Sequence, residues 1–191
     1  MAHSNKQAGH KPSAKLRLKK RLKRAILIAV CILIAGYLLP EHFVLPVAGM
    51  NDRSFHHKSF WYYPWGTSVR HKGVDIFAVK GTKVRTSTSG IVLYCGEHKR
   101  GGNMVLVLGP KWRIHRYLHL DTIMARPYSF IRHGQTIGKV GNSGNAKGKP
   151  SHLHYAISTP VPYVWQANTG IQGWKKIWYI DPTPYLQHTT S

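Results

Sequence analysis

The chain has 191 residues, the length of one ordinary domain with an additional segment. It carries 28 Lys and Arg against 6 Asp and Glu, which gives a formal net charge of +22, and 42% of its residues are hydrophobic. This hydrophobic content excludes a disordered chain, and so few carboxylates disfavour a two-carboxylate glycosidase site or an EF-hand loop. A basic surface favours a polyanionic partner, such as nucleic acid, anionic lipid or a cell-wall polymer, or serves solubility alone.

The N-terminus combines a basic arm with an apolar run. Residues 1–24 contain nine Lys and Arg and no acidic residue, and residues 25–39 are uncharged. Fifteen helical residues are about 22 Å long, which is shorter than the ~30 Å hydrocarbon core of a bilayer. Leu22 extends the run, and the two basic residues after it can snorkel. We therefore expect one transmembrane helix over residues 25–39 that acts as a signal anchor.

Two alternatives to an uncleaved anchor stay open. A cleaved signal peptide is one, although the nearest cleavage motif, Pro46-Val47-Ala48, has Pro where a small residue is preferred. A core helix of the domain is the other, and the polybasic flank disfavours it. With an anchor, the positive-inside rule keeps the basic arm in the cytoplasm beside anionic lipid and exports residues 41–191. The expected protein is a single-pass inner-membrane protein, which disfavours a specific nucleic-acid partner.

The remainder divides into a linker and lead-in over residues 40–68 and a folded domain over residues 69–187. Short β-branched runs separated by Gly and Pro favour a mainly β, antiparallel fold, and no amphipathic helix is evident. Residues 161–178 are irregular and aromatic. The expected strands are residues 74–78, 90–95, 103–108, 112–120, 135–140 and 154–158.

Two histidines share one face of the last expected strand. Residues i and i+2 of a strand point the same way, so His152 and His154 face outwards while Leu153, Tyr155 and Ile157 face the core. Two adjacent imidazoles on an outer face suit metal binding or proton transfer.

A second pair, His71 and Asp75, lies four residues apart. In a straight strand the two side chains would be about 13 Å apart, so they share an ion only if the chain bends, which Gly73 permits. Zinc favours such ligands, and three protein ligands with an open position are typical of catalytic zinc. Each motif alone has a high risk of occurring by chance.

Two further histidines, His115 and His133, are taken as ordinary surface or core residues. Strand alternation places His115 on the same face as His119, about 13 Å from it.

The context of these histidines resembles peptidase family M23, the lysostaphin/LytM-type zinc metalloendopeptidases. Motifs of the family occur in order along residues 69–158, and residues 180–186 resemble its usual ending. The four principal blocks are His71-Lys-Gly73-Val-Asp75, Gly102-Asn103-Met-Val105, Tyr117-Leu-His119-Leu120 and Ser151-His152-Leu-His154-Tyr155.

The resemblance implies a compact antiparallel β-sheet metallopeptidase domain with a substrate groove and one bound Zn²⁺. It implies that His71, Asp75 and His154 bind the zinc and that His119 and His152 are catalytic. The implied substrate is a peptide of the peptidoglycan cross-links or stems. Tyr163 and Trp165 are candidates for the groove wall, although packing is the commoner role of such residues.

Two other functions stay open beside the enzyme. Some M23-like proteins have lost zinc ligands and regulate other wall hydrolases, whereas all five residues are present here. A basic nucleic-acid or lipid binder is the other, and its affinity would fall steeply with salt. The bond that is cut and the oligomeric state do not follow from the sequence.

Overall fold

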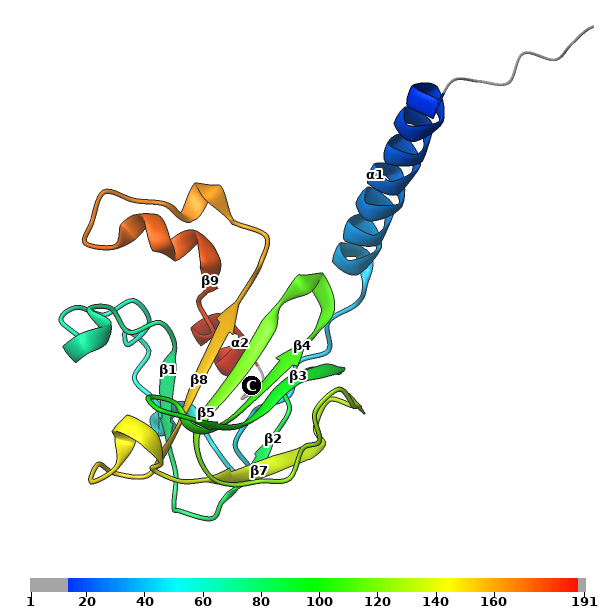
Figure 1. Ribbon diagram of the computed structural model, residues 1–191. Helices are drawn as coiled ribbons and strands as arrows, with labels where there is room; N and C mark the ends of the chain where they lie inside the picture. The colour runs from blue at the N-terminus through cyan, green and yellow to red at the C-terminus, as the bar shows by residue number, and fades with distance from the viewer. Residues whose placement is uncertain (1–13, 189–191) are drawn as a thin grey trace, which may run out of the picture. The chain divides into compact units, whose positions relative to one another are not determined.

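The computed structural model describes residues 14–188 (Figure 1). The chain divides into two compact units, Met1–Leu38 and Leu39–Ser191. Helix α1, Ala14–Leu38, is the described part of the first unit, and the second unit is a β domain.

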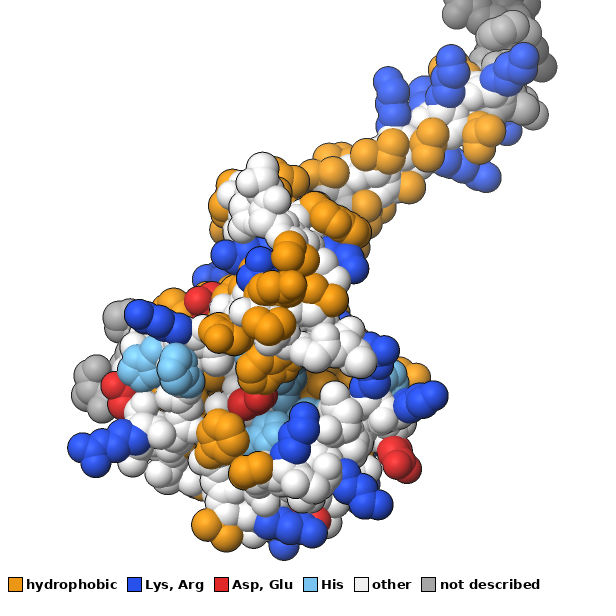
Figure 2. Space-filling view, turned by 90° about the vertical axis from the view of Figure 1, so that its left-hand side faces the viewer, with side chains coloured by type: hydrophobic (Ala, Val, Ile, Leu, Met, Phe, Trp, Pro, Cys, Tyr) orange, Lys and Arg blue, Asp and Glu red, His pale blue; other side chains and the backbone are white. Residues whose placement is uncertain are grey.

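Helix α1 joins the basic arm and the apolar run into one element of 25 residues. Basic side chains gather towards one end of it and hydrophobic side chains towards the other (Figure 2). Within residues 14–188, no helix is both long and apolar enough to cross a membrane. The expected transmembrane helix over residues 25–39 is therefore not supported, because the uncharged run falls short of the ~20 residues that span a bilayer and charged residues fill the turns before it. Residues 1–13 of the predicted arm lie outside the described residues.

The second unit contains one antiparallel sheet of nine strands in its described part (Figure 1). The main path of neighbouring strands is β1-β8-β5-β4-β3-β6, with β9 beside β8, and β7 joins β2 to β5. A short helix, α2, Thr183–His188, follows the last strand. The strands are β1 Val74–Phe77, β2 Lys83–Arg85, β3 Gly90–His98, β4 Gly102–Leu108, β5 Ile114–Ile123, β6 Phe130–Ile131, β7 Thr136–Val140, β8 His152–Ser158 and β9 Tyr179–Ile180.

The predicted antiparallel β class is confirmed, and each of the six expected runs overlaps one strand, although β3, β4, β5 and β8 extend beyond the expected bounds. The unpredicted strands β2, β6 and β9 have two or three residues, which is too short for a periodic pattern. Residues 161–178 form loops with two 3₁₀ turns, Val164–Gln166 and Gly173–Trp178, as the irregular sequence predicts.

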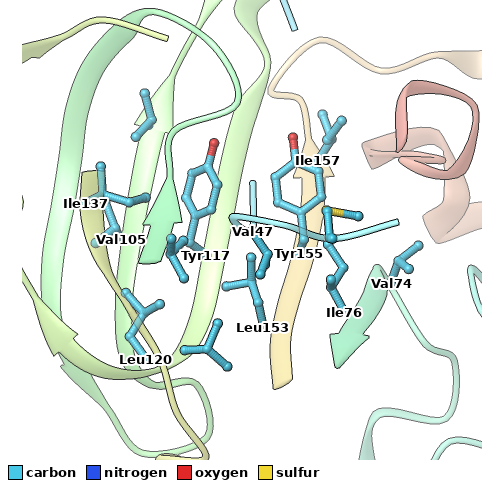
Figure 3. Packing of buried hydrophobic residues seen from close by; sticks show 14 of the residues in the cluster. Val47, Val74, Ile76, Val105, Tyr117, Leu120, Ile137, Leu153, Tyr155 and Ile157 are labelled. Carbon is cyan, nitrogen blue, oxygen red and sulfur yellow. The ribbon is translucent and has the colours of Figure 1, made fainter. Parts of the chain in front are cut away.

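Strand alternation gives the sheet a core face and an outer face. On β8, Leu153, Tyr155 and Ile157 are fully buried, and they pack with Ile76 of β1 and Tyr117 of β5 (Figure 3). Full burial of such a side chain stabilises a fold by roughly 1.5–3 kcal/mol. The core therefore fixes which residues of β1, β5 and β8 remain for the outer face.

The lead-in segment belongs to this core. Val47 and Phe55 are buried in it, and their backbones form isolated bridges with Val84 and Ile76. Residues 40–68 thus fold back onto the sheet.

Candidate metal centre

Three candidate ligands meet on the outer face of β1 and β8. Asp75 lies between buried Val74 and Ile76 and is directly opposite His154 in the strand register. His71 precedes β1 and turns back towards the same point. His154 Nδ1 lies 2.8 Å from Asp75 Oδ1, and His71 Nε2 lies 3.1 Å from each of these atoms.

Gly73 allows this approach because of close packing. A Cβ atom at Gly73 would lie 2.5 Å from the carbonyl oxygen of Tyr155 and 2.9 Å from His154 Nε2. Distances this short are steric clashes, so any larger residue would push His71 away from β8. The expected turn at Gly73 is present, and contact with β8 is the reason for the glycine.

Hydrogen bonding fixes the tautomer of His71. Its Nδ1 lies 2.9 Å from the carbonyl oxygen of Ser59, and a carbonyl only accepts, so Nδ1 donates. In the neutral ring Nε2 then carries a lone pair, and this lone pair faces the carboxylate of Asp75. Such a contact is favourable only when a proton or a metal cation lies between the two atoms.

The charge on Asp75 is not balanced by a basic side chain. Within the described residues its ion-pair contacts are all with histidines, namely His71, His152 and His154. Burial raises the pKa of Asp75, but the close contacts with the imidazoles of His154 and His71 outweigh it and hold the pKa far below the usual range. The centre is therefore an ionised carboxylate between imidazoles.

These three residues fit a zinc ion. The three ligand atoms lie within 4.8 Å of one another, and two imidazoles with one carboxylate are ligands that zinc accepts. Tetrahedral bonds of about 2.0–2.1 Å place zinc ligands about 3.3 Å apart, a few tenths of an ångström more than the distances here. Three ligands leave a fourth position open.

Two more imidazoles border the centre. His119 Nδ1 lies 2.9 Å from the carbonyl oxygen of Ser143, and His152 Nδ1 lies 2.8 Å from that of Pro150. Both Nδ1 atoms therefore donate, which leaves a lone pair on Nε2 of each neutral ring. The ring centroid of His119 is 5.1 Å from that of His152 and 6.0 Å from that of His154. Burial, followed by the neighbouring His154 and His152, lowers the pKa of His119 to about 4.

His119 reaches this face through a break in the alternation of β5. Its φ is 65°, and the register of β5 against β4 shifts between Tyr117 and Leu120, the stretch that contains His119. Leu118 and His119 consequently both line the outer face, while Leu120 is buried in the core. The prediction that His115 and His119 share a face is wrong, because alternation ends at a β-bulge.

A groove of about 480 Å³ runs past the metal centre and is lined by all five predicted site residues. Figure 2 shows the histidines and a carboxylate in a hollow of the domain surface. Trp65 covers one side, with its ring stacked on that of His71 at 3.9 Å between centroids. A smaller hollow of about 250 Å³ lies beside it. Residues common to the two are Trp65, Asp75 and Phe77.

Several groove residues were not predicted. Trp65 and Arg116 stand outside the family motifs, and no local spacing singles them out. The two aromatic candidates, Tyr163 and Trp165, are not among the lining residues: Tyr163 packs against the core, and Trp165 is 74% exposed.

The histidines taken as ordinary lie elsewhere. His115 is buried, with Nδ1 2.7 Å from the hydroxyl of Tyr155, and His133 pairs with Ser89 near the surface.

Known proteins share this domain. The sequence profile of peptidase family M23 matches residues 69–165. The peptidoglycan DD-endopeptidase ShyA of Vibrio cholerae serotype O1 is 37% identical over 87 residues, which cover 46% of this chain and 20% of that protein. The murein hydrolase activator NlpD of Salmonella dublin is 31% identical over 88 residues, which cover 46% of this chain and 22% of that protein.

The catalytic domain of lysostaphin, an antimicrobial peptidase from Staphylococcus simulans, has a similar structure. The TM-score is 0.54 at 26% identity, over 67% of this chain and 88% of that domain. The chain matches only about a fifth of the length of the two curated relatives. The family profile, however, covers half of the chain and includes every residue of the metal centre. The protein therefore belongs to peptidase family M23.

Proposed function

We propose that the protein is a zinc metalloendopeptidase that hydrolyses peptide bonds in the cross-links or stems of peptidoglycan. One observation carries the proposal. An ionised Asp75 and the lone pair of His71 face each other beside His154, with no basic side chain to balance them among the described residues. The peptidoglycan endopeptidase among the relatives supports the substrate class.

His71, Asp75 and His154 would hold the metal. A bound zinc ion supplies a Lewis acid that activates water and polarises a peptide carbonyl. The chain prepares for this role by holding His71 through the Ser59 carbonyl, which keeps Nε2 available as a ligand.

His119 and His152 would handle protons. Their Nδ1 atoms donate to backbone carbonyls, so each ring is oriented and offers Nε2 as a base. The lowered pKa of His119 keeps its ring neutral at pH 7. One imidazole would accept the proton that the attacking water loses and return it to the leaving amine. The other imidazole, in its protonated form, would donate a hydrogen bond to the carbonyl oxygen and stabilise the negative charge that develops there.

A second candidate function is regulation of other wall hydrolases, which the relative named a murein hydrolase activator favours. The intact metal centre favours the enzyme. Either function requires the domain to reach the cell wall, so we also propose that residues 41–191 are exported. A reporter that is active only outside the cytoplasm, fused after Ser191, tests this location.

Zinc analysis and digestion of purified sacculi test the proposal. The full chain should hold one zinc ion and release soluble peptidoglycan fragments from sacculi. His154→Ala should lose the zinc and the release together, whereas His133→Ala, which removes an exposed histidine, should keep both. A zinc-loaded chain that releases nothing but accelerates an added wall hydrolase would support the regulatory function instead.

A further inference from the structure

The groove beside the metal centre carries an excess of positive charge. Asp75 is the only acidic residue among those that line it, and the histidines surround this carboxylate. Within residues 14–188, the basic side chains of the groove make no ion pair with Asp or Glu. These basic residues are Arg70, Lys72, Arg100, Arg116 and Lys149.

This charge is confined to the larger groove. The smaller hollow, which shares Trp65, Asp75 and Phe77 with the groove, contains no Lys or Arg, and its other lining residues are His56, Ser59 and Tyr62. Basic side chains also crowd one another in the groove. Burial, followed by the nearby Lys175 and Arg100, lowers the pKa of Lys72. The two hollows that meet at Asp75 thus differ in charge.

Arg116 is the basic residue of the groove that is best placed to bind an anion. Its Nε donates to Ser158 Oγ at 2.8 Å, which holds the guanidinium plane on the sheet. The contact uses one of the five N–H groups of the side chain. By contrast, Arg70 donates to two backbone carbonyls, and Lys72 donates to one.

The strand register sets the reach of Arg116. Arg116 is opposite Ala156 on β8, and Leu118 is opposite His154, so Arg116 lies two residues along the sheet from the metal centre. Two strand residues span about 7 Å, the length of about two residues of an extended substrate. Ala156, the register partner of Arg116, also lines the groove, and its small side chain takes up little of the space beside the guanidinium.

We propose that Arg116 binds a substrate carboxylate within two residues of the scissile bond, and that the groove thereby selects anionic peptides over neutral ones. A guanidinium can hold a carboxylate through two parallel hydrogen bonds, a geometry that a lysine lacks. The inference rests on the proposed function, because it names the substrate class of the same groove.

The test compares two forms of one substrate. Soluble cross-linked peptides released from peptidoglycan are used directly and after conversion of their carboxylates to N-methyl amides. The ratio of kcat/KM for the two forms is measured for the wild type, Arg116→Gln and Arg116→Lys. Arg85→Gln is the matched control, because Arg85 is an exposed strand residue outside the groove and its loss changes the net charge equally.

The wild type and Arg85→Gln should prefer the carboxylate form. Arg116→Gln should lower this preference roughly 10–100-fold, the worth of hydrogen bonds to a charged group, and Arg116→Lys should retain part of it. A purely structural role for Arg116 would lower both rates and leave their ratio unchanged, and that result would overturn the inference.

Binding separates the inference from the proposed function. The affinities of the zinc-loaded proteins for both peptide forms are measured by calorimetry. If no variant hydrolyses either form but the wild type binds the carboxylate form more tightly and Arg116→Gln does not, the function fails and the inference holds. If hydrolysis occurs with an equal ratio in the wild type and Arg116→Gln, the function holds and the inference fails. Equal binding of both forms by the wild type, without hydrolysis, overturns both.

Discussion

Strand β5 joins two regions that carry the same kinds of residues in opposite situations, a closed end at its first residues and an open end at the bulge near its middle. At one end His115 lies 3.4 Å from the carboxylate of Glu41, and the side chains of both are almost completely buried. Arg113 pairs with that carboxylate and donates to the hydroxyl of Tyr185. At the other end His119 faces the groove, and the nearby Asp75 has no basic partner in the described part of the chain.

The difference shows that the surroundings of an imidazole and a carboxylate decide whether the pair stabilises the fold or is available to a ligand. At the closed end a buried arginine already supplies the positive charge, and burial leaves no space for a ligand. Burial raises the pKa of Glu41, but the contact with His115 and the charge of Arg113 outweigh it and lower the pKa. At the open end Asp75 has only histidines beside it in the described part of the chain, and the three candidate ligands border an open groove.

The largest expected effect is at the open end. Asp75→Asn keeps the shape of the side chain but removes the charge, so bound zinc should fall from one per chain to near zero and sacculus hydrolysis should fall to background. Metal analysis and peptide release measure the two effects. Asp52→Asn, at an exposed acidic residue, should change neither. A zinc-loaded, active Asp75→Asn would remove this carboxylate from the ligand set.

The next effect separates the histidines of the two ends. His119→Asn and His152→Gln should keep the zinc and lower the rate of hydrolysis by about 10²–10⁴-fold, because a general acid–base group is lost. Asn also tolerates the positive φ of His119. His115→Gln at the closed end should keep the rate per folded molecule. Near-normal turnover in both outer-face variants would contradict their catalytic assignment.

At the closed end the expected change is in stability. Glu41→Gln leaves Arg113 buried without a charge partner, which should lower the free energy of unfolding by about 3–5 kcal/mol while zinc content stays unchanged. Urea titration in chelator measures the stability. A loss below about 1 kcal/mol would mean that the buried carboxylate contributes no more than an exposed pair.

The smallest effect is a pH dependence of the metal-free protein. The pKa of His119 is about 4 when folded and 6.5 ordinarily, so below pH 6.5 the unfolded chain takes up a proton that the folded chain does not. This contribution to stability is present above pH 6.5, decreases as the pH falls and is lost below about pH 4. At pH 5 the free energy of unfolding should be lower than at pH 7 by about 2 kcal/mol on account of His119. Urea titrations at pH 7 and pH 5 should show a smaller difference for His119→Asn, and an unchanged difference would contradict the lowered pKa.

Local rules predicted much of the domain from its sequence. Alternation on β8 placed Leu153 and Tyr155 in the core and left His152 and His154 for the outer face, as the structure has them. Such predictions succeed because a strand imposes a two-residue period that no distant contact has to supply. The motifs also indicated the family, because several motifs in one fixed order are more specific than any single motif. The family profile confirms this prediction.

Other features depend on contacts between residues that are distant in the sequence. His119 reaches the outer face because β5 shifts register against β4 at this point, and a local pattern cannot reveal such a bulge. Glu41 lies within the predicted linker, yet it pairs with Arg113, 72 residues away. No spacing along the chain indicates a partner at that separation.

The sequence by itself therefore determined the β class, the outward histidines of β8 and, through its motifs, the three residues that meet in the candidate metal centre. Tertiary structure alone decided that a bulge carries His119 to the outer face, that His115 lies beside Glu41 in the core, and that Arg116 lies two strand residues from the centre. The physical reason is how far apart along the chain the interacting residues lie. Side-chain direction within a strand follows from backbone geometry, whereas register, bulges and charge partners follow from the packing of strands that meet only after the chain has folded.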